Sequence, residues 1–189
     1  MVDVIEHSTR KAAIDGLVVI TMKQVTDDRG TVREFFRRSA FEAAGLPELQ
    51  PFVQVNVTES RRGAIRGLHA EAMTKLVAVA AGEAFAAYVD LRTGSPTHGV
   101  VDTLTLVPGV QVLVPAGVAN GFQAVVDGTQ YVYCFDREWQ PDMAGTACNP
   151  LDPALQIDWP VPVDPDDRSR VSAKDMAAPR FADVVGRTS

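Results

Sequence analysis

The sequence has few of the residues that build metal sites or disulfide frameworks. Its 189 residues include two cysteines, Cys134 and Cys148, and three histidines, His7, His69 and His98. The cysteines lack a CxxC spacing and have no histidine beside them, so we interpret both as small buried hydrophobic residues. The histidines are not spaced as the ligands of one metal ion. We therefore expect neither a metal nor any other cofactor.

Long apolar runs and an excess of positive charge are also missing. No hydrophobic stretch approaches the roughly 18 residues of a membrane span. Residues 1–10 lack the basic start and apolar core of a secretory signal. A net charge of −6 provides no broad basic face for nucleic acid. The sequence predicts a soluble cytoplasmic protein that binds neither nucleic acid nor membranes, in which an anionic ligand would need a local basic pocket.

Short β-rich runs between glycine and proline turns make up most of the chain. They predict an all-β sandwich or barrel, with short helices at 39–45 and after Ser172. Prolines interrupt the segment 158–167, which is expected to be irregular and to lie over the barrel. We expect one domain, 1–189, with a C-terminal strap from about residue 153 to residue 189. The predicted strands are 16–21, 52–58, 75–80, 84–91, 100–106, 111–114 and 130–135.

His69 is the candidate base of a catalytic site. It ends the run Arg66-Gly67-Leu68-His69, and Lys75 follows nearby. A neutral imidazole can accept a proton near pH 7. The same residues are equally compatible with a structural histidine at the edge of a strand.

Four basic residues are spread over several predicted strands: Arg29, Arg66, Lys75 and Arg92. In a barrel such residues can converge on one mouth and bind phosphate by charge-assisted hydrogen bonds. For any one of them alone, a solvated surface charge is the better interpretation.

Many short motifs together, in one order along nearly the whole chain, resemble the dTDP-4-dehydrorhamnose 3,5-epimerase family. The shared run Arg66 to His69 alone would be a weak indication, but the set of motifs at similar spacing is a strong one. The main pieces are Asp28-Arg29-Gly30 with Glu34, Gln54-Val55-Asn56, Arg66-Gly67-Leu68-His69, Lys75-Leu76-Val77, Val89-Asp90-Leu91-Arg92, Val114-Pro115-Ala116-Gly117, Gly121-Phe122, Asp158-Trp159-Pro160 and Ser172-Ala173-Lys174-Asp175.

This resemblance implies a cupin-type jelly roll, a homodimer and a dTDP-linked 4-keto-6-deoxyhexose as the substrate, in deoxysugar biosynthesis. In such enzymes a histidine oriented by a carboxylate removes the proton at C3 or C5, beside the C4 ketone, and a lysine holds the enolate oxygen. The resemblance assigns these roles to His69, Asp175 and Lys75. The positions it implies for substrate binding are Arg29, Glu34, Gln54, Asn56, Arg66, Asn120 and Trp139.

Several positions differ from the family pattern. Trp139 stands where the family has a proton-returning tyrosine, and an indole N–H donates a hydrogen bond without being a usable acid. Its ring can still stack on a thymine or a sugar. Asn120 replaces a histidine, Ala86 an aspartate and Val32 an aromatic residue, and the loop before Lys75 is shorter.

Three functions follow from this pattern. The first is epimerisation of the keto sugar, at one carbon or at both. The second is isomerisation of a related ketosugar by the same histidine-centred enolisation. The third is non-catalytic binding of a sugar nucleotide.

Overall fold

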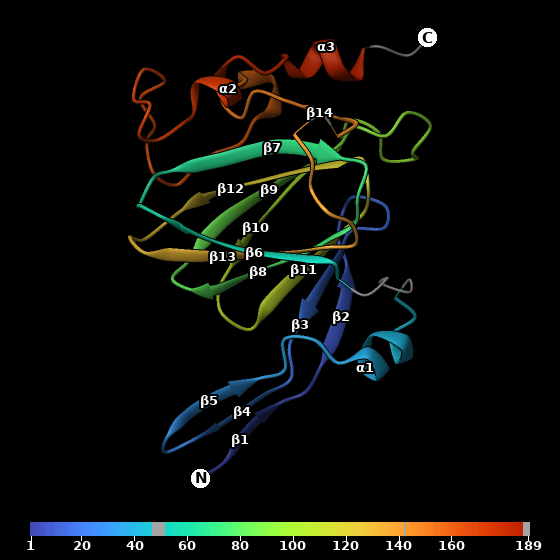
Figure 1. Cartoon of the computed structure of the whole chain (residues 1–189), viewed down its shortest axis with the longest axis vertical. Helices are drawn as coiled ribbons and strands as arrows, with labels where there is room; N and C mark the ends of the chain where they lie inside the picture. Colours follow the sequence, from blue (N-terminus) through green and yellow to red (C-terminus); the bar gives the residue numbers. More distant parts are fainter. Residues whose placement is uncertain (47–51, 142, 187–189) are drawn as a thin grey trace.

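Two antiparallel sheets pack face to face and form a barrel (Figure 1). The computed structural model describes residues 1–46, 52–141 and 143–186. The larger sheet has the strand order β2-β3-β11-β8-β13-β6 and the smaller sheet has the order β10-β9-β12-β7-β14. Successive strands from β6 to β9, and again from β10 to β14, alternate between the two sheets. This arrangement is the expected jelly roll.

The strand bounds are as follows. The larger sheet contains β2 (Ser8–Lys11), β3 (Val18–Thr21), β6 (Gln54–Ser60), β8 (Lys75–Ala81), β11 (Val110–Val114) and β13 (Thr129–Phe135). The smaller sheet contains β7 (Ile65–Glu71), β9 (Ala84–Asp90), β10 (Val101–Leu106), β12 (Val118–Ala124) and β14 (Gly145–Ala147).

The core lies between the sheets because alternate residues of each strand point inward. Val77 and Tyr131 of the larger sheet meet Tyr88 and Phe122 of the smaller sheet, and all four are fully buried. The rings of Phe122 and Tyr131 stack with their centroids 4.0 Å apart. Burial of each such side chain contributes about 1.5–3 kcal/mol, so this layer stabilises the packing of the two sheets.

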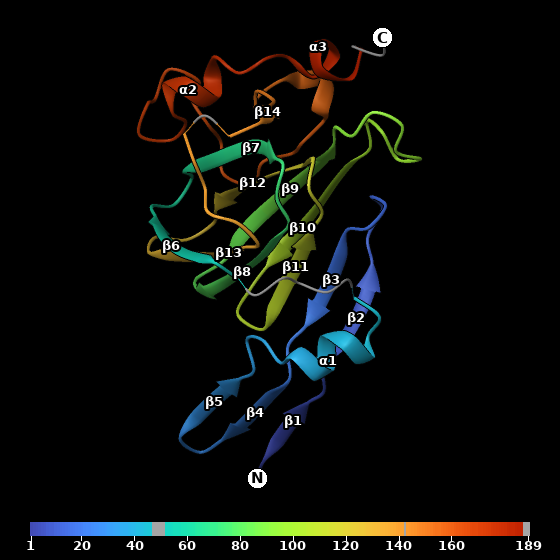
Figure 2. The ribbon, with the colours of Figure 1, turned by 45° about the vertical axis from the view of Figure 1, so that its right-hand side comes forward.

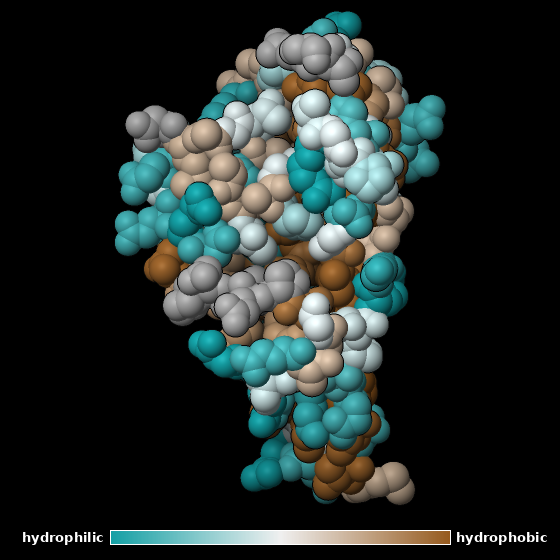
Figure 3. Space-filling view, turned by 90° about the vertical axis from the view of Figure 1, so that its right-hand side faces the viewer, coloured by the Kyte–Doolittle hydropathy of each residue, from teal (hydrophilic) through white to brown (hydrophobic). Residues whose placement is uncertain are grey.

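A third, three-stranded sheet extends from one end of the barrel and is here called the N-terminal arm (Figures 1 and 2). It consists of β1 (Asp3–Ile5), β4 (Gln24–Asp27) and β5 (Gly30–Arg33). Apolar atoms gather on its surface in Figure 3, and Val4, Ile5 and Val32 are among its exposed side chains. A small sheet of this kind needs a packing partner to be stable.

Helices lie at both ends of the molecule. The helix α1 (Arg38–Ala43) buries Phe41 against the outer face of the larger sheet. The C-terminal strap contains η1 (Pro153–Leu155), α2 (Ala173–Met176) and α3 (Phe181–Val185), and it covers the outer face of the smaller sheet (Figure 1). In the described part of the chain, no helix has the length and apolar character that crossing a bilayer requires.

The predicted strands and the two helices are confirmed to within a few residues, and residues 158–167 are irregular as expected. The sequence analysis missed the three strands of the N-terminal arm, as well as β2, β14, β7 and β12. The last two lie side by side in the smaller sheet. Both carry a glycine at their contact: a Cβ on Gly67 would lie 2.5 Å from Cα of Gly121. Glycine weakens the strand pattern in a sequence, yet only glycine permits this close approach.

The two cysteines are buried and unpaired, as predicted. Burial raises the pKa of each thiol, Cys134 and Cys148, to about 11. Their thiols are therefore protonated and unreactive near neutral pH.

A buried carboxylate organises the loop after β9. Asp90 accepts hydrogen bonds from Arg92 Nη2 (2.8 Å), Ser95 Oγ (2.6 Å) and Thr97 Oγ1 (2.6 Å). Burial alone would raise the pKa of Asp90, but these donors outweigh it and hold the pKa well below its usual range. Arg92 thus serves this loop, and it is not among the residues that line the hollows around His69 described below.

Replacing Asp90 with Asn should destabilise the fold, because it leaves the Arg92 guanidinium without its charge partner. We expect a loss of about 3 kcal/mol, or roughly 6–12 °C in Tm for a chain of this size. The carboxylate stabilises the folded state above about pH 4 and loses this effect as pH falls further, so the difference from wild type should narrow in acid. Thermal unfolding at several pH values tests this, with the exposed Asp158→Asn as the control. Equal Tm values for wild type and Asp90→Asn at pH 7 would contradict the stabilising role of the Asp90 carboxylate.

Candidate active site

Three adjoining hollows open around His69 at the end of the barrel nearest the strap. The inner hollow, about 170 Å³, is enclosed by inward-facing strand residues. A basic hollow of about 460 Å³ and a rim hollow of about 270 Å³ lie beside it. His69 is the residue common to all three, so the hollows form one candidate site. The inner hollow is lined by Asn56, Arg66, His69, Glu71, Lys75, Asn120, Tyr133, Phe135 and Trp139.

His69 is paired with a carboxylate that lies 106 residues further along the chain. Its Nε2 is 2.7 Å from Oδ1 of Asp175, which α2 presents from the strap. Ser172 caps α2 by accepting the backbone N–H of Asp175 at 3.0 Å. Burial opposes ionisation of Asp175, but hydrogen bonding, chiefly with His69, outweighs it and holds the pKa of Asp175 below its usual range. The carboxylate is therefore ionised and can only accept a hydrogen bond.

Lys75 is the buried cation of the inner hollow. Its Nζ contacts the Glu71 carboxylate and donates to the carbonyl oxygen of His69 (3.2 Å) and to Oδ1 of Asn120 (3.3 Å). Burial lowers the pKa of Lys75, and the charge of Glu71 opposes this shift. The Nδ2 group of Asn120 is buried and has no hydrogen-bond partner among the described residues.

Trp139 closes the inner hollow from the side. Its backbone N–H donates to Oε1 of Gln54 at 2.7 Å, and Gln54 Nε2 donates to Oδ1 of Asn56 at 3.1 Å. Asn56 lines the hollow directly, whereas Gln54 acts through its contact with the backbone of Trp139. Both predicted residues thus belong to the site, in different ways.

Cations gather in the basic hollow. Arg66, which donates to Ser60 Oγ at 3.0 Å, is joined there by Arg168, Arg170 and Lys174 from the strap. The sequence analysis did not identify these three strap residues, although Lys174 stands next to Asp175. In the sequence these three residues form only a short basic run, and the fold brings that run to Arg66. The result is the local basic pocket that an anionic ligand of this acidic protein requires.

Two predicted site residues do not reach His69 within the chain. Arg29 lies at the tip of the N-terminal arm, where its side chain is 90% exposed and pairs with Asp27 at 2.6 Å. Glu34 follows the arm and pairs with Arg37. The arm extends away from the strap end of the barrel (Figure 1). The site seen in one chain therefore contains His69, Asp175, Lys75, Gln54, Asn56, Arg66, Asn120 and Trp139.

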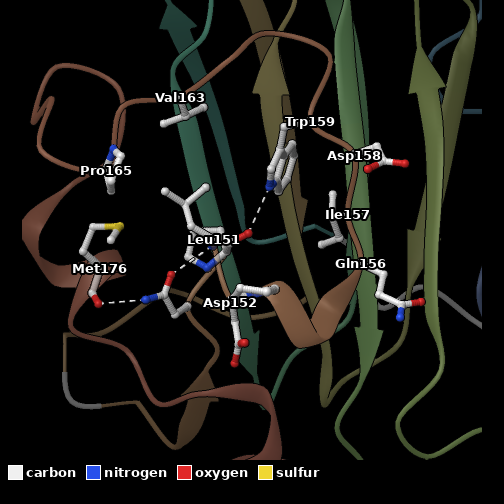
Figure 4. A pocket seen from close by; sticks show the side chains of 12 residues that line it. Leu151, Asp152, Gln156, Ile157, Asp158, Trp159, Val163, Pro165 and Met176 are labelled. Atoms are coloured by element: carbon white, nitrogen blue, oxygen red, sulfur yellow. Dashed lines mark hydrogen bonds between the residues drawn. The ribbon is translucent and has the colours of Figure 1, made fainter.

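A separate hollow of about 530 Å³ lies within the strap region (Figure 4). Its polar groups hold the chain together: Trp159 Nε1 donates to the carbonyl oxygen of Pro150 at 2.9 Å, and Asn149 Nδ2 donates to that of Met176 at 3.0 Å. Met176 follows Asp175 directly. These hydrogen bonds thus help to hold the strap in place, and the strap supplies Asp175, the partner of His69.

Replacing Asn149 with Ala should loosen α2, because it removes the bond to Met176. We expect a cost of about 1 kcal/mol, with faster amide hydrogen exchange at residues 173–176 than in wild type. Hydrogen exchange followed by mass spectrometry measures this. The exposed strap variant Asp158→Ala is the control. Exchange at α2 as slow in Asn149→Ala as in wild type would show that the Asn149–Met176 hydrogen bond does not hold α2.

A carboxylate-paired histidine beside a buried lysine, in the mouth of a jelly-roll barrel, defines an enzyme site for proton transfer next to a carbonyl. Within residues 1–46, 52–141 and 143–186, no three His, Cys, Asp or Glu side chains gather so as to hold a metal ion. The sequence profile of dTDP-4-dehydrorhamnose 3,5-epimerase matches residues 11–183. The chain belongs to this family.

Individual relatives agree with this assignment. The dTDP-4-dehydrorhamnose 3,5-epimerase of Pseudomonas aeruginosa is 37% identical over 180 residues, which cover 92% of this chain and 96% of the relative. NovW, a 4-keto-6-deoxy sugar epimerase from the novobiocin biosynthetic gene cluster of Streptomyces spheroides, superposes with a TM-score of 0.84 at 31% identity, covering 95% of this chain and 89% of NovW. ChmJ, a 3'-monoepimerase from Streptomyces bikiniensis in complex with dTDP-quinovose, gives a TM-score of 0.82 at 31% identity, covering 92% and 89%.

Proposed function

We propose that this protein epimerises a dTDP-linked 4-keto-6-deoxyhexose by removing and returning a proton beside the C4 ketone, in deoxysugar biosynthesis. The observation that carries this proposal is the pairing of His69 with Asp175 at a hollow that also contains Lys75. The family and the ligand of ChmJ, dTDP-quinovose, support the substrate class. The cytoplasmic location remains a prediction from the sequence.

His69 acts as the base. Because the ionised Asp175 only accepts hydrogen bonds, Nε2 of His69 carries a hydrogen atom and donates the hydrogen bond to Asp175. The Nδ1 atom then has the free lone pair and removes the proton from the sugar carbon. The nearby carboxylate stabilises the imidazolium that forms, in the way an aspartate supports a catalytic histidine in hydrolases.

Lys75 stabilises the enolate. Removing a proton beside a ketone moves negative charge to the ketone oxygen, and a cation held in a partly dehydrated hollow favours that charge. Lys75 supplies the cation in this hollow. Lys75 itself is buried, which lowers the solvent screening of its charge.

The diphosphate binds in the basic hollow. Arg66, Arg168, Arg170 and Lys174 line it beside His69 and Asp175, and guanidinium groups suit the paired oxygens of a phosphate. Trp139, at the join of the inner and rim hollows, offers a ring face on which a sugar or thymine stacks. The ligand thus places its ketone in the inner hollow and its phosphates outside.

The test is incubation with dTDP-4-keto-6-deoxyglucose in D2O, with deuterium entry at C3 and C5 followed by NMR. Wild type should exchange at one or both carbons, and His69→Ala should lower the rate about 10²–10⁴-fold, the usual contribution of a general base. His98→Ala, outside the hollows, is the matched control. A protein whose Tm rises with dTDP but which exchanges neither proton would be a binder rather than an epimerase.

We further propose that the protein is a homodimer whose second copy covers β6 and the N-terminal arm. The strand β6 is an edge of the larger sheet, and Val53, Val55 and Val57 on or beside it are exposed. An open apolar edge strand is normally covered. Such a dimer would carry the partner's arm, and with it Arg29 and Glu34, toward the His69 site, which explains why these two matched positions lie far from His69 in one chain.

Placing a charge on the exposed face of β6 should separate the copies, because a buried aspartate in an apolar interface loses its hydration. We expect Val55→Asp to elute as a folded monomer with reduced activity, whereas Val126→Asp, in the turn between β12 and β13, stays dimeric. Size-exclusion chromatography with light scattering measures this. A wild-type monomer at micromolar concentration would refute the dimer.

A further inference from the structure

Burial works against the positive charge on Lys75, which the proposed epimerisation requires and on which this inference rests. The side chain of Lys75 is 4% exposed. Burial favours the neutral form of an amine, because an ion loses its hydration inside a protein. A neutral amine stabilises an enolate far less than an ammonium does. The site therefore needs a group that keeps Lys75 protonated in spite of its burial.

Glu71 is the group that opposes this effect of burial. The charged or titratable residues that line the hollow with Lys75 are Arg66, His69 and Glu71 on β7 and Tyr133 on β13. Among these described residues, Glu71 is the one with a negative charge at neutral pH, and its carboxylate contacts the Lys75 ammonium. The nearby Asp175 carboxylate is paired with His69. Burial lowers the pKa of Lys75, and the charge and hydrogen bond of Glu71 act in the opposite direction.

The connection between β7 and β8 holds Glu71 and Lys75 together. Glu71 is the last residue of β7 in the smaller sheet, and Lys75 is the first residue of β8 in the larger sheet. Residues 72–74 join them. Met73 in this connection is buried, and the backbone N–H of Thr74 donates to Oδ1 of Asp136 at 3.2 Å. The carboxylate therefore holds the ammonium from a short, anchored segment of the chain.

The two charges of the pair differ in their exposure to solvent. The Glu71 side chain is 18% exposed and lines both the inner and the rim hollows, whereas Lys75 is 4% exposed and lines the inner hollow. Solvent therefore screens the carboxylate more than the ammonium. Lys75 also donates to two neutral oxygens, the carbonyl of His69 (3.2 Å) and Oδ1 of Asn120 (3.3 Å). A ketone oxygen can replace one of these neutral acceptors while the stronger, charge-assisted contact with Glu71 remains.

We propose that Glu71 is a positioning residue that keeps Lys75 protonated and anchors its ammonium while the ketone oxygen of the sugar takes one of its other contacts. Glu71 itself neither removes nor returns a proton of the sugar. His69 removes the proton, the electron pair moves to the ketone oxygen, and Lys75 remains an ammonium beside that oxygen throughout.

The titration of Lys75 tests the electrostatic part of this proposal without any substrate. The chain has four lysines, so the Cε signal of each can be followed by NMR in protein labelled with 13C-lysine. Glu71→Gln keeps an acceptor for Lys75 but removes the charge, and we expect Lys75 to lose its proton at a lower pH than in wild type. Glu71→Asp keeps the charge and should restore most of the wild-type titration. Lys11, which is exposed on β2, is the internal reference.

Deuterium exchange into dTDP-4-keto-6-deoxyglucose tests the catalytic part. At about pH 8.5, we expect Glu71→Gln to exchange about 100-fold more slowly than wild type, the usual effect of losing one group that stabilises an oxyanion. This loss should become smaller toward about pH 6, where Lys75 of the variant regains its proton. It should lie in the maximal rate rather than in KM. Glu83→Gln, in the turn between β8 and β9 and outside the three hollows, is the matched control, and the Tm of every variant is compared with wild type.

Identical titration of Lys75 in wild type and in Glu71→Gln would overturn the proposal. A loss of exchange that is equally large at every pH would also overturn it, because Glu71 would then act only on the shape of the site. Failure of the proposed function has a different signature: wild type would exchange neither carbon, whatever the titration of Lys75 shows.

Discussion

The hydrogen bond between His69 and Asp175 is the contact on which the site depends. It joins β7 of the barrel to α2 of the strap across 106 residues. For it to form, the strap has to cover the smaller sheet, Ser172 has to cap α2, and β7 has to approach β12 through Gly67 and Gly121. The packing of Leu155, Trp159 and Phe181 on the outer face of that sheet supplies the apolar burial that holds the strap in place.

Electrostatics divide the molecule into two regions. The whole chain carries a net charge of −6, which disfavours broad binding of anions. The strap nevertheless brings Arg168, Arg170 and Lys174 to Arg66 beside the His69–Asp175 pair. The same segment therefore supplies both Asp175, the carboxylate partner of His69, and three of the four basic side chains beside it. Loss of strap packing would remove both properties together, which couples stability at this end of the barrel to function.

The inner hollow differs chemically from the family pattern inferred from the sequence. Trp139 occupies the place of a tyrosine acid, and Asn120 occupies that of a histidine. The hollow also contains Glu71 and Lys75, whose charged groups are in direct contact. His69 and Lys75, two of the positions matched to the family pattern, both line this hollow. Trp139 remains part of the wall, held through its backbone by Gln54.

The sequence by itself determined the all-β class, seven strand positions, the irregular strap and, through its resemblance to a family, the jelly roll. It also singled out His69, Asp175 and Lys75, which the structure brings close together. Alternating apolar residues, turn glycines and motif order are local signals, so they can be read without coordinates. The tertiary structure alone showed that Arg92 serves the Asp90 loop, that Arg29 and Glu34 lie far from His69 within one chain, and that Glu71 contacts Lys75. These outcomes depend on which distant segments pack together and on which acceptor each hydrogen-bond donor binds. A pattern along the sequence specifies neither.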